Sequence, residues 1–382
     1  MIIYNLLFNG TIYLYSPDGE LYYSIAENFV NNGHFIQTAR PYEVSFVVPP
    51  GLPLVYTILY CLLHNINAVI LIQYVLFGIT ALFFKEIVKE LFDNEFFSYI
   101  GLALFIGNRV VIVEANPAYL LTEPYTLLLS VIWIYFFVLR VDDDNEKWRL
   151  TALWLFSFVL FIIRPALSIF YVFSCVIIIK QVFKKVYSIK RFLALAIIMA
   201  MFLLINIGVN YRETGTFVFL ENYSGIAVYE ANNPNTKVYA YSSDLADDFT
   251  EERFWGVEAD ENLTRGEKSE IYKEWVKEYI KTNPMLCLKN TLKKLYYMFI
   301  AYYHWDFYLS ILAFVLMRKE ERRRVFVPCA LTGICAAITS IGLNISRYSL
   351  CAVPIYALMK TAFIFIIFRF FYDKKTRMVS AK

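Results

Sequence analysis

Long apolar stretches recur from one end of the chain to the other, separated by short polar or charged stretches. Several approach the roughly 20 residues that an α-helix needs to cross about 30 Å of hydrocarbon. We therefore expect an all-α polytopic membrane protein with about ten transmembrane helices and a small extracytoplasmic segment. The expected segments lie near residues 1–15, 67–84, 98–113, 119–140, 150–163, 165–179, 192–210, 304–317, 325–343 and 349–371.

Clusters of lysine and arginine indicate which loops face the cytoplasm, because cytoplasmic loops carry an excess of these residues. The apolar helix expected at 52–63 must then lie along the outer interface, since counting it as a crossing would invert every later loop. A helix break or hairpin apex is expected at Arg164-Pro165, where two short apolar segments meet. The clusters are Lys85 with Lys89, the 140–149 stretch, the 180–191 stretch, Arg318 to Arg324, and the 374–377 tail.

This orientation leaves one long polar segment outside the cytoplasm, at 211–303. Residues 211–284 hold 8 Lys/Arg and 15 Asp/Glu, a net charge of −7, which suits an extracytoplasmic face and argues against nucleic-acid binding. Residues 267–303 are typical of an amphipathic helix, a break at Pro284 and a second helix with its lysines near lipid phosphates. We expect three parts, namely an N-terminal transmembrane module (1–210) with a catalytic first outer loop (16–66), the polar segment (211–303), and C-terminal helices with a basic tail (304–382).

Composition supports the membrane assignment and gives no sign of a metal site. Of the 382 residues, 59% are hydrophobic and 18% are charged, whereas soluble domains are about half apolar and a quarter charged. The six cysteines are scattered without metal-ligand spacing, and the three histidines lie far apart. We therefore expect no cofactor and no divalent metal.

Three carboxylates at the expected outer face fit acid–base chemistry. Asp18 and Glu20 follow the first apolar segment, and Glu123 begins the fourth. A carboxylate at such a place can act as a general base, and an ionisable group at the membrane edge is a functional candidate. The alternatives are a solvated acid beside a Pro-Asp-Gly turn for Asp18 and a helix-dipole partner for Glu123.

Two arginines lie at the edges of apolar segments on the same expected face, Arg164 in FIIRPALS and Arg347 in NISRYSLCAVP. Each needs a carboxylate, a phosphate or water, and guanidinium geometry suits two-point contact with a phosphate. The alternative is that each side chain snorkels to the interface. Carboxylates and arginines on one face predict a site that holds a lipid phosphate and deprotonates a hydroxyl.

These residues lie in stretches that resemble a known family. SPDGELYYSIAENFVNNGHF followed by VPPGLPLVYTILYCLLH is similar to the first outer loop of GT-C membrane glycosyltransferases. That set includes dolichyl-phosphate-mannose protein mannosyltransferases and bacterial lipid A sugar transferases. Further similar stretches follow in order over nearly the whole chain, namely LLTEPYTLLL, FIIRPALS, FVFLENYSGIAVYEANNPNT, EWVKEYIKTNP with LKKLYYMF, and SRYSLCAVPIYAL.

The resemblance implies an inverting transfer of a hexosyl or pentosyl group from a polyprenyl-phosphate carrier to an extracytoplasmic glycan, lipid or protein. Asp18 matches the position of the family's catalytic acid and would be the general base, with Glu123 as a second acid. Many relatives have adjacent acids where this chain has Asp18-Gly19-Glu20, so the role of Glu20 is less defined. The implied substrate-binding residues are Arg164, Arg347, Tyr348 and Lys293.

The resemblance also implies a multi-pass protein of the cell membrane, with a bacterial cytoplasmic membrane expected and the active site on its outer side. Two alternatives stay open. One is a non-enzymatic translocase for lipid-linked glycans, in which the same charges guide a polar headgroup. The other is an inactive subunit of an envelope-assembly system.

Overall fold

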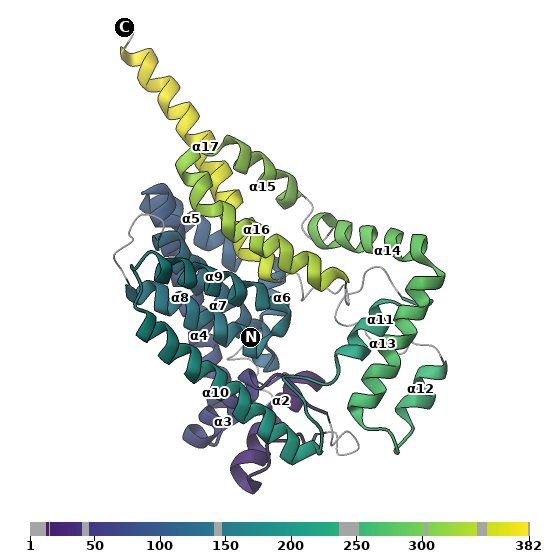
Figure 1. The fold of residues 1–382 in the computed structure, drawn as a ribbon. Helices are drawn as coiled ribbons and strands as arrows, with labels where there is room; N and C mark the ends of the chain where they lie inside the picture. Colours follow the sequence, from purple (N-terminus) through teal and green to yellow (C-terminus); the bar gives the residue numbers. More distant parts are fainter. Residues whose placement is uncertain are drawn as a thin grey trace.

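The computed structural model describes residues 13–14, 16–39, 46–140, 147–236, 252–301, 305–341 and 350–380. Within these ranges every regular element is a helix (Figure 1), which confirms the all-α expectation. Most of the expected first segment, 1–15, lies outside the described residues.

Four helices are long and apolar enough to cross a membrane, at Ile66–Phe92, Pro165–Phe183, Ile189–Thr214 and Leu350–Tyr372. Two bent pairs raise the number to six if each pair is one span; they are Glu95–Ile106 with Arg109–Tyr119, bent by 55°, and Pro284–Ile300 with Trp305–Leu316, bent by 75°. Length and composition therefore support four to six spans and a membrane protein, while the count of about ten stays a prediction.

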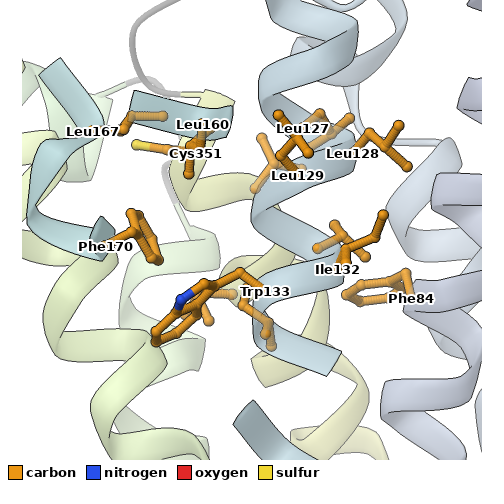
Figure 2. Close-up of a cluster of buried hydrophobic side chains, with 14 of the residues drawn as sticks. Phe84, Leu127, Leu128, Leu129, Ile132, Trp133, Leu160, Leu167, Phe170 and Cys351 are labelled. Carbon is orange, nitrogen blue, oxygen red and sulfur yellow. The ribbon is translucent and has the colours of Figure 1, made fainter. Parts of the chain in front are cut away.

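The helix bundle is built around α7 (Glu123–Arg140), which packs against α4 (Ile66–Phe92) and α8 (Lys147–Ile163). Apolar side chains fill the space between these helices (Figure 2). The Trp133 ring of α7 packs edge-to-face against Phe170, with ring centroids 4.9 Å apart. Its indole N–H donates to Ser174 Oγ at 2.9 Å. Both partners lie on α9 (Ser168–Phe183), so this buried contact fixes α9 to α7.

The N-terminal and C-terminal helices flank this bundle. Helix α2 (Pro17–Asn32) packs on α3 (Gly51–Leu63), and α5 (Glu95–Ile106) lies between α4 and α17 (Val353–Ser380). The remaining elements of these parts are α6 (Arg109–Glu114), η2 (Pro117–Tyr119), α10 (Ile189–Thr214), α14 (Pro284–Tyr296), η6 (Tyr297–Ala301), α15 (Trp305–Leu316) and α16 (Lys319–Ile341). Helix α3 confirms the helix expected at 52–63, and its interfacial placement stays a prediction.

The helix boundaries confirm two expected breaks. Arg164 has extended backbone, and Pro165 then begins the short helix η3 (Pro165–Leu167) before α9. Helix α8 packs against α9, so the chain folds back there as a hairpin. Likewise, α13 (Arg265–Thr282) ends just before Pro284, where α14 begins, because proline is favoured at the first position of a helix and disfavoured inside one.

The basic cluster expected in a loop after residue 84 lies on a helix instead. Helix α4 continues to Phe92, so Lys85 and Lys89 occupy its last turns. Their ammonium groups lie 2.6 and 3.0 Å from the two carboxylate oxygens of Glu95, at the start of α5. The apolar part of α4 thus continues into a charged end as one unbroken helix.

Helices α11 (Ser224–Ala231), α12 (Glu252–Glu258) and α13 form what we call the side lobe, drawn to the right of the bundle in Figure 1. Its core is an aromatic stack, in which Phe254 lies 5.7 Å from Tyr229 and 5.0 Å from Tyr272 between ring centroids. Helix α11 approaches α13 closely at Gly225, where an added Cβ would lie 2.1 Å from the Ser269 carbonyl oxygen. The lobe therefore has its own small core.

The end of the first loop connects the side lobe to α2. Val47 N–H donates to the Asn222 side chain at 2.8 Å, and the Phe46 ring stacks on Tyr223 at 5.0 Å. The Arg265 guanidinium of α13 lies 5.2 Å from the centre of the Phe46 ring. Phe46 and Val48 also pack with Leu21 and Ile25 of α2, so the end of the first loop lies between α2 and the lobe.

Candidate functional site

Asp18 and Glu20 lie in the first turn of α2. The Ser16 hydroxyl caps this helix by accepting a hydrogen bond from the Gly19 amide at 3.4 Å, and Pro17 follows at the first helical position. Carboxylates are favoured there by the helix dipole. The turn expected at Pro-Asp-Gly is thus the start of a helix. Asp18 is half-buried and Glu20 is exposed, so the two acids have different surroundings.

Gly19 explains how this turn is positioned. A Cβ at Gly19 would lie 2.0 Å from the Tyr119 carbonyl oxygen, so only glycine permits this approach. Nearby, the Leu14 amide donates to the Ala118 carbonyl oxygen at 2.9 Å. The first turn of α2 therefore lies directly against the segment that leads into Glu123.

Glu123 and Arg164 form an ion pair at the end of the bundle. Arg164 Nη1 lies 3.0 Å from Glu123 Oε1, and the two side chains are 13% and 2% exposed. The Thr122 hydroxyl donates to the other carboxylate oxygen at 3.1 Å. In the structure Arg164 thus contacts a carboxylate, one of the three partners expected for it, and Glu123 contacts a cation in addition to beginning α7.

Buried polar side chains surround this pair. Gln73 Nε2 of α4 donates to the Tyr56 hydroxyl of α3 at 3.3 Å, and both side chains are fully buried. Burial raises the pKa of the Tyr56 phenol well above its usual value, and the neighbouring Tyr125, Tyr22 and Glu123 act in the same direction. Within the described residues, Gln73 Oε1 and the Tyr125 hydroxyl are buried without a hydrogen-bond partner.

A row of tyrosines leads from this cluster to the surface. The ring centroids of Tyr125 and Tyr56 are 6.1 Å apart, those of Tyr56 and Tyr23 are 6.1 Å apart, and those of Tyr23 and Tyr60 are 5.8 Å apart. The Tyr60 hydroxyl donates to the exposed Glu27 carboxylate at 3.3 Å. The cluster is thus lined by phenol rings, which can stack against sugars and offer hydroxyls to them.

Arg347 and Tyr348 lie outside the described residues. The described chain resumes at Leu350, and Cys351 lies in the buried cluster drawn in Figure 2 together with Leu160 and Leu167. Those two leucines flank Arg164 in sequence on either side of the helix break. The start of α17 is therefore brought close to the Glu123–Arg164 pair.

Lys293 is not brought to Asp18. It is exposed on α14, which Figure 1 draws well apart from α2. Together with Lys289 and apolar neighbours it lines a shallow hollow of about 360 Å³ on one face of that helix. Lys294, expected to face lipid phosphates, is buried and donates to the Ala231 carbonyl oxygen at 2.6 Å, because α14 turns this side towards α11.

Sequence reasoning missed Gly19, Gln73 and Tyr56. The signal for Gln73 was available, since it is an amide inside an apolar segment, where a polar group needs a partner. The signals for Gly19 and Tyr56 were not, because a glycine after Asp and one tyrosine among 30 look ordinary in sequence. A second ion pair was also missed, between Lys360 Nζ of α17 and Asp306 Oδ2 of α15 at 2.9 Å.

The arrangement offers a carboxylate base and a guanidinium cation. In the part of the chain that the structure describes, no group of three or more metal-ligating side chains gathers. What gathers is a half-buried carboxylate, a buried Glu–Arg pair and phenols with spare hydrogen-bonding capacity. Such a set can bind a polar, hydroxyl-rich group and accept a proton from it.

Comparison with protein-family models, with curated proteins and with solved structures finds no match.

Proposed function

We propose that this protein is an integral membrane glycosyltransferase of the GT-C type. It transfers a sugar, with inversion, from a polyprenyl-phosphate carrier to an acceptor outside the cytoplasm. The observation that carries the proposal is a pair of contacts between distant parts of the chain. The first turn of α2, which holds Asp18, lies against the segment that leads into Glu123, and Glu123 pairs with Arg164. The proposal also rests on the resemblance in sequence.

In the proposed reaction Asp18 accepts the proton of the acceptor hydroxyl. The acceptor oxygen then bonds to the anomeric carbon of the sugar, and the bond from that carbon to the carrier phosphate breaks, with the electron pair leaving on the phosphate. Arg347 and Arg164 offset the charge that develops on this phosphate. Glu123 orients the Arg164 guanidinium through the 3.0 Å contact, and the buried phenols bind sugar hydroxyls.

The finer topology belongs to the same proposal. About ten crossings are expected from the apolar stretches, an extracytoplasmic site from the distribution of Lys and Arg, and a cell-membrane location from the resemblance. Cysteine-accessibility labelling tests this part. Labels that reach positions 18 and 347 from opposite sides of the membrane contradict a common active site.

The decisive test is Asp18→Asn, assayed in membranes with a radiolabelled polyprenyl-phosphate sugar. We expect normal insertion and loss of transfer by about 10²-fold or more, because general base catalysis typically contributes that much. Undiminished transfer removes Asp18 from the mechanism. The matched control is Glu27→Gln, the same loss of a carboxylate farther along α2, where the side chain is exposed and accepts a hydrogen bond from Tyr60.

The competing function is a translocase for lipid-linked glycans, favoured by the ion pair being buried at the end of the bundle. Vesicles that contain the purified protein and a fluorescent lipid-linked sugar distinguish the two. Movement of the intact lipid between leaflets, without transfer of its sugar to an acceptor, supports the translocase and contradicts the enzyme.

A further inference from the structure

A second cavity, separate from the candidate site, lies between α8 and α10 and measures about 630 Å³. Helix α8 lines it with the face that runs from Trp148 to Val159, and α10 lines it with Arg191, Ala194 and Leu195. Its walls are apolar except for Arg191 at one end and the hydroxyl of Thr151. A volume of 300–1,000 Å³ is typical of small-molecule sites.

The cavity is an open groove on the side of the helix bundle. Helices α8 and α10 contact each other through stacked Trp154 and Phe192, with ring centroids 5.2 Å apart, and through Phe158 and Phe202 at 5.9 Å. Beside this contact the alanines of both helices leave the space unfilled. Only 11% of the most apolar stretch of α10 is buried inside the protein, which is the lowest share among the four candidate spans. Lipid therefore reaches the groove from the side.

The length of the groove matches one leaflet. Trp148 and Val159 are eleven residues apart, which is about 16 Å at the rise of an α-helix. The hydrocarbon core of a bilayer is about 30 Å thick, so the groove spans about half of it. This is the depth that an acyl chain occupies when its headgroup lies at the interface.

The mouth of the groove carries positive charge. The ends of α8, α9 and α10 meet there, since the Tyr187 hydroxyl lies 2.7 Å from Thr151 Oγ1. The Arg191 guanidinium lies 6.0 Å from the centre of the Tyr187 ring, and it forms no ion pair within the described ranges. Basic residues in this part of the sequence are Lys147, Arg149, Lys180, Lys184, Lys185, Lys190 and Arg191. The stretch 141–146, with three aspartates and one glutamate, lies outside the described residues.

We propose that this groove binds an anionic phospholipid of the leaflet at the α8 N-terminus. One acyl chain lies along the apolar face of α8, and the phosphate contacts Arg191, whose planar guanidinium suits two-point contact with phosphate oxygens. Trp148 lies at the level of the headgroup, where tryptophan is favoured.

The groove is distinct from the proposed catalytic site. Its mouth lies at the start of α8, whereas Arg164 follows the other end of the same helix. The phosphate held at Arg191 is thus at the opposite end of the bundle from the Glu123–Arg164 pair. The inference stands whether or not the protein transfers sugars, because its test measures lipid binding alone.

The test is native mass spectrometry of the purified protein with phosphatidylglycerol and phosphatidylcholine of identical acyl chains. Wild type is expected to retain phosphatidylglycerol in preference to phosphatidylcholine. Arg191→Gln should lower the retained phosphatidylglycerol about fivefold, the effect of one basic residue near an anionic surface. Ala194→Phe, which fills the groove at an exposed position of α10, should lower the retention of both lipids.

The matched control is Lys190→Gln, which removes the neighbouring positive charge outside the groove lining. It should retain at least half of the wild-type phosphatidylglycerol. An equal loss in Lys190→Gln and Arg191→Gln indicates general surface charge and overturns the proposal. Retention at the wild-type level in both Arg191→Gln and Ala194→Phe overturns it as well. Unchanged elution and melting temperature confirm that the variants are folded.

Discussion

A glutamate–arginine ion pair lies in each of two regions of the molecule, the helix bundle and the side lobe. In the bundle, Glu123 and Arg164 are 3.0 Å apart, and the glutamate is 2% exposed. In the lobe, Glu258 and Arg265 are 2.6 Å apart, and the glutamate is 18% exposed. The two pairs join the same chemical groups, and they differ in how far the glutamate is exposed.

The two pairs also differ in the polar groups that lie beside them. Glu258 also accepts a hydrogen bond from the Tyr272 hydroxyl, and its carbonyl oxygen accepts one from Lys268 Nζ at 2.7 Å. Beside the bundle pair, Gln73 Oε1 and the Tyr125 hydroxyl are buried without a partner within the described residues. Unsatisfied buried groups cost stability unless a ligand or water completes them. The lobe glutamate is therefore the more exposed of the two and has further contacts from α13, whereas the bundle pair lies beside polar atoms that a ligand could complete.

The largest effect is expected from breaking the bundle pair. Glu123→Gln leaves the Arg164 charge buried without its carboxylate and should lower the free energy of unfolding by about 3–5 kcal/mol. The double variant Glu123→Gln/Arg164→Met should recover most of this loss. Unfolding by SDS titration in mixed micelles measures both. A single variant as stable as wild type contradicts a buried pair.

The same double variant separates stability from function. If the pair serves only the fold, the variant should transfer sugar as well as wild type once stability is recovered. If the pair holds the carrier phosphate, transfer should stay lost in a stable protein. The radiolabel assay described above reads this out.

A smaller and more local effect is expected in the side lobe. Glu258→Gln removes the charge from contacts with Arg265 and Tyr272, and hydrogen bonds to charged groups contribute about 1.5–3 kcal/mol. Amide hydrogen exchange should rise in 265–282 and stay unchanged in the bundle. The control Glu270→Gln removes an exposed pair, in which Glu270 is 66% and Lys273 37% exposed. It should change stability by less than about 0.5 kcal/mol. Faster exchange throughout the bundle contradicts an independently packed lobe.

The smallest effect is expected at the close approach of α2. Gly19→Ala places a Cβ 2.0 Å from the Tyr119 carbonyl oxygen, so α2 must shift, at a cost of about 1–3 kcal/mol. Transfer should fall with it, because the Asp18 turn moves away from the Glu123 segment. Gly78→Ala is the control, since nothing lies within 4 Å of its Cβ position, and it should leave stability equal or raised by up to about 1 kcal/mol. Equal melting temperatures and activities for the two variants contradict the close approach.

Much of the helical architecture was predictable, because apolar runs and proline breaks are local signals. Helix α10 matches the segment expected at 192–210, and the breaks at Arg164 and Pro284 occur where they were expected. The segment expected at 98–113 is instead bent by 55° between α5 and α6. The bend lies at Gly107-Asn108, where Asn108 caps the new helix by accepting from the Val110 amide at 2.9 Å.

The candidate site was predictable only in part. The sequence indicated that Arg164 needs a carboxylate, a phosphate or water, and that Asp18 and Glu123 are candidate acids at the same face. It did not pair Glu123 with Arg164 or place Lys294 inside, because both depend on which face of a helix a neighbour covers. Lys294 and Lys293 are adjacent in sequence, yet one is buried against Ala231 and the other is exposed.

By itself the sequence determined that this chain is helical and apolar enough for a membrane, because these properties follow from the composition and spacing of neighbouring residues. The tertiary structure decided which charges meet, which lysine is buried and where two helices leave a groove. Those outcomes depend on contacts between residues far apart in the chain, such as Gly19 with Tyr119 and Glu123 with Arg164. Their energies exist only once the helices have packed, so no local pattern encodes them.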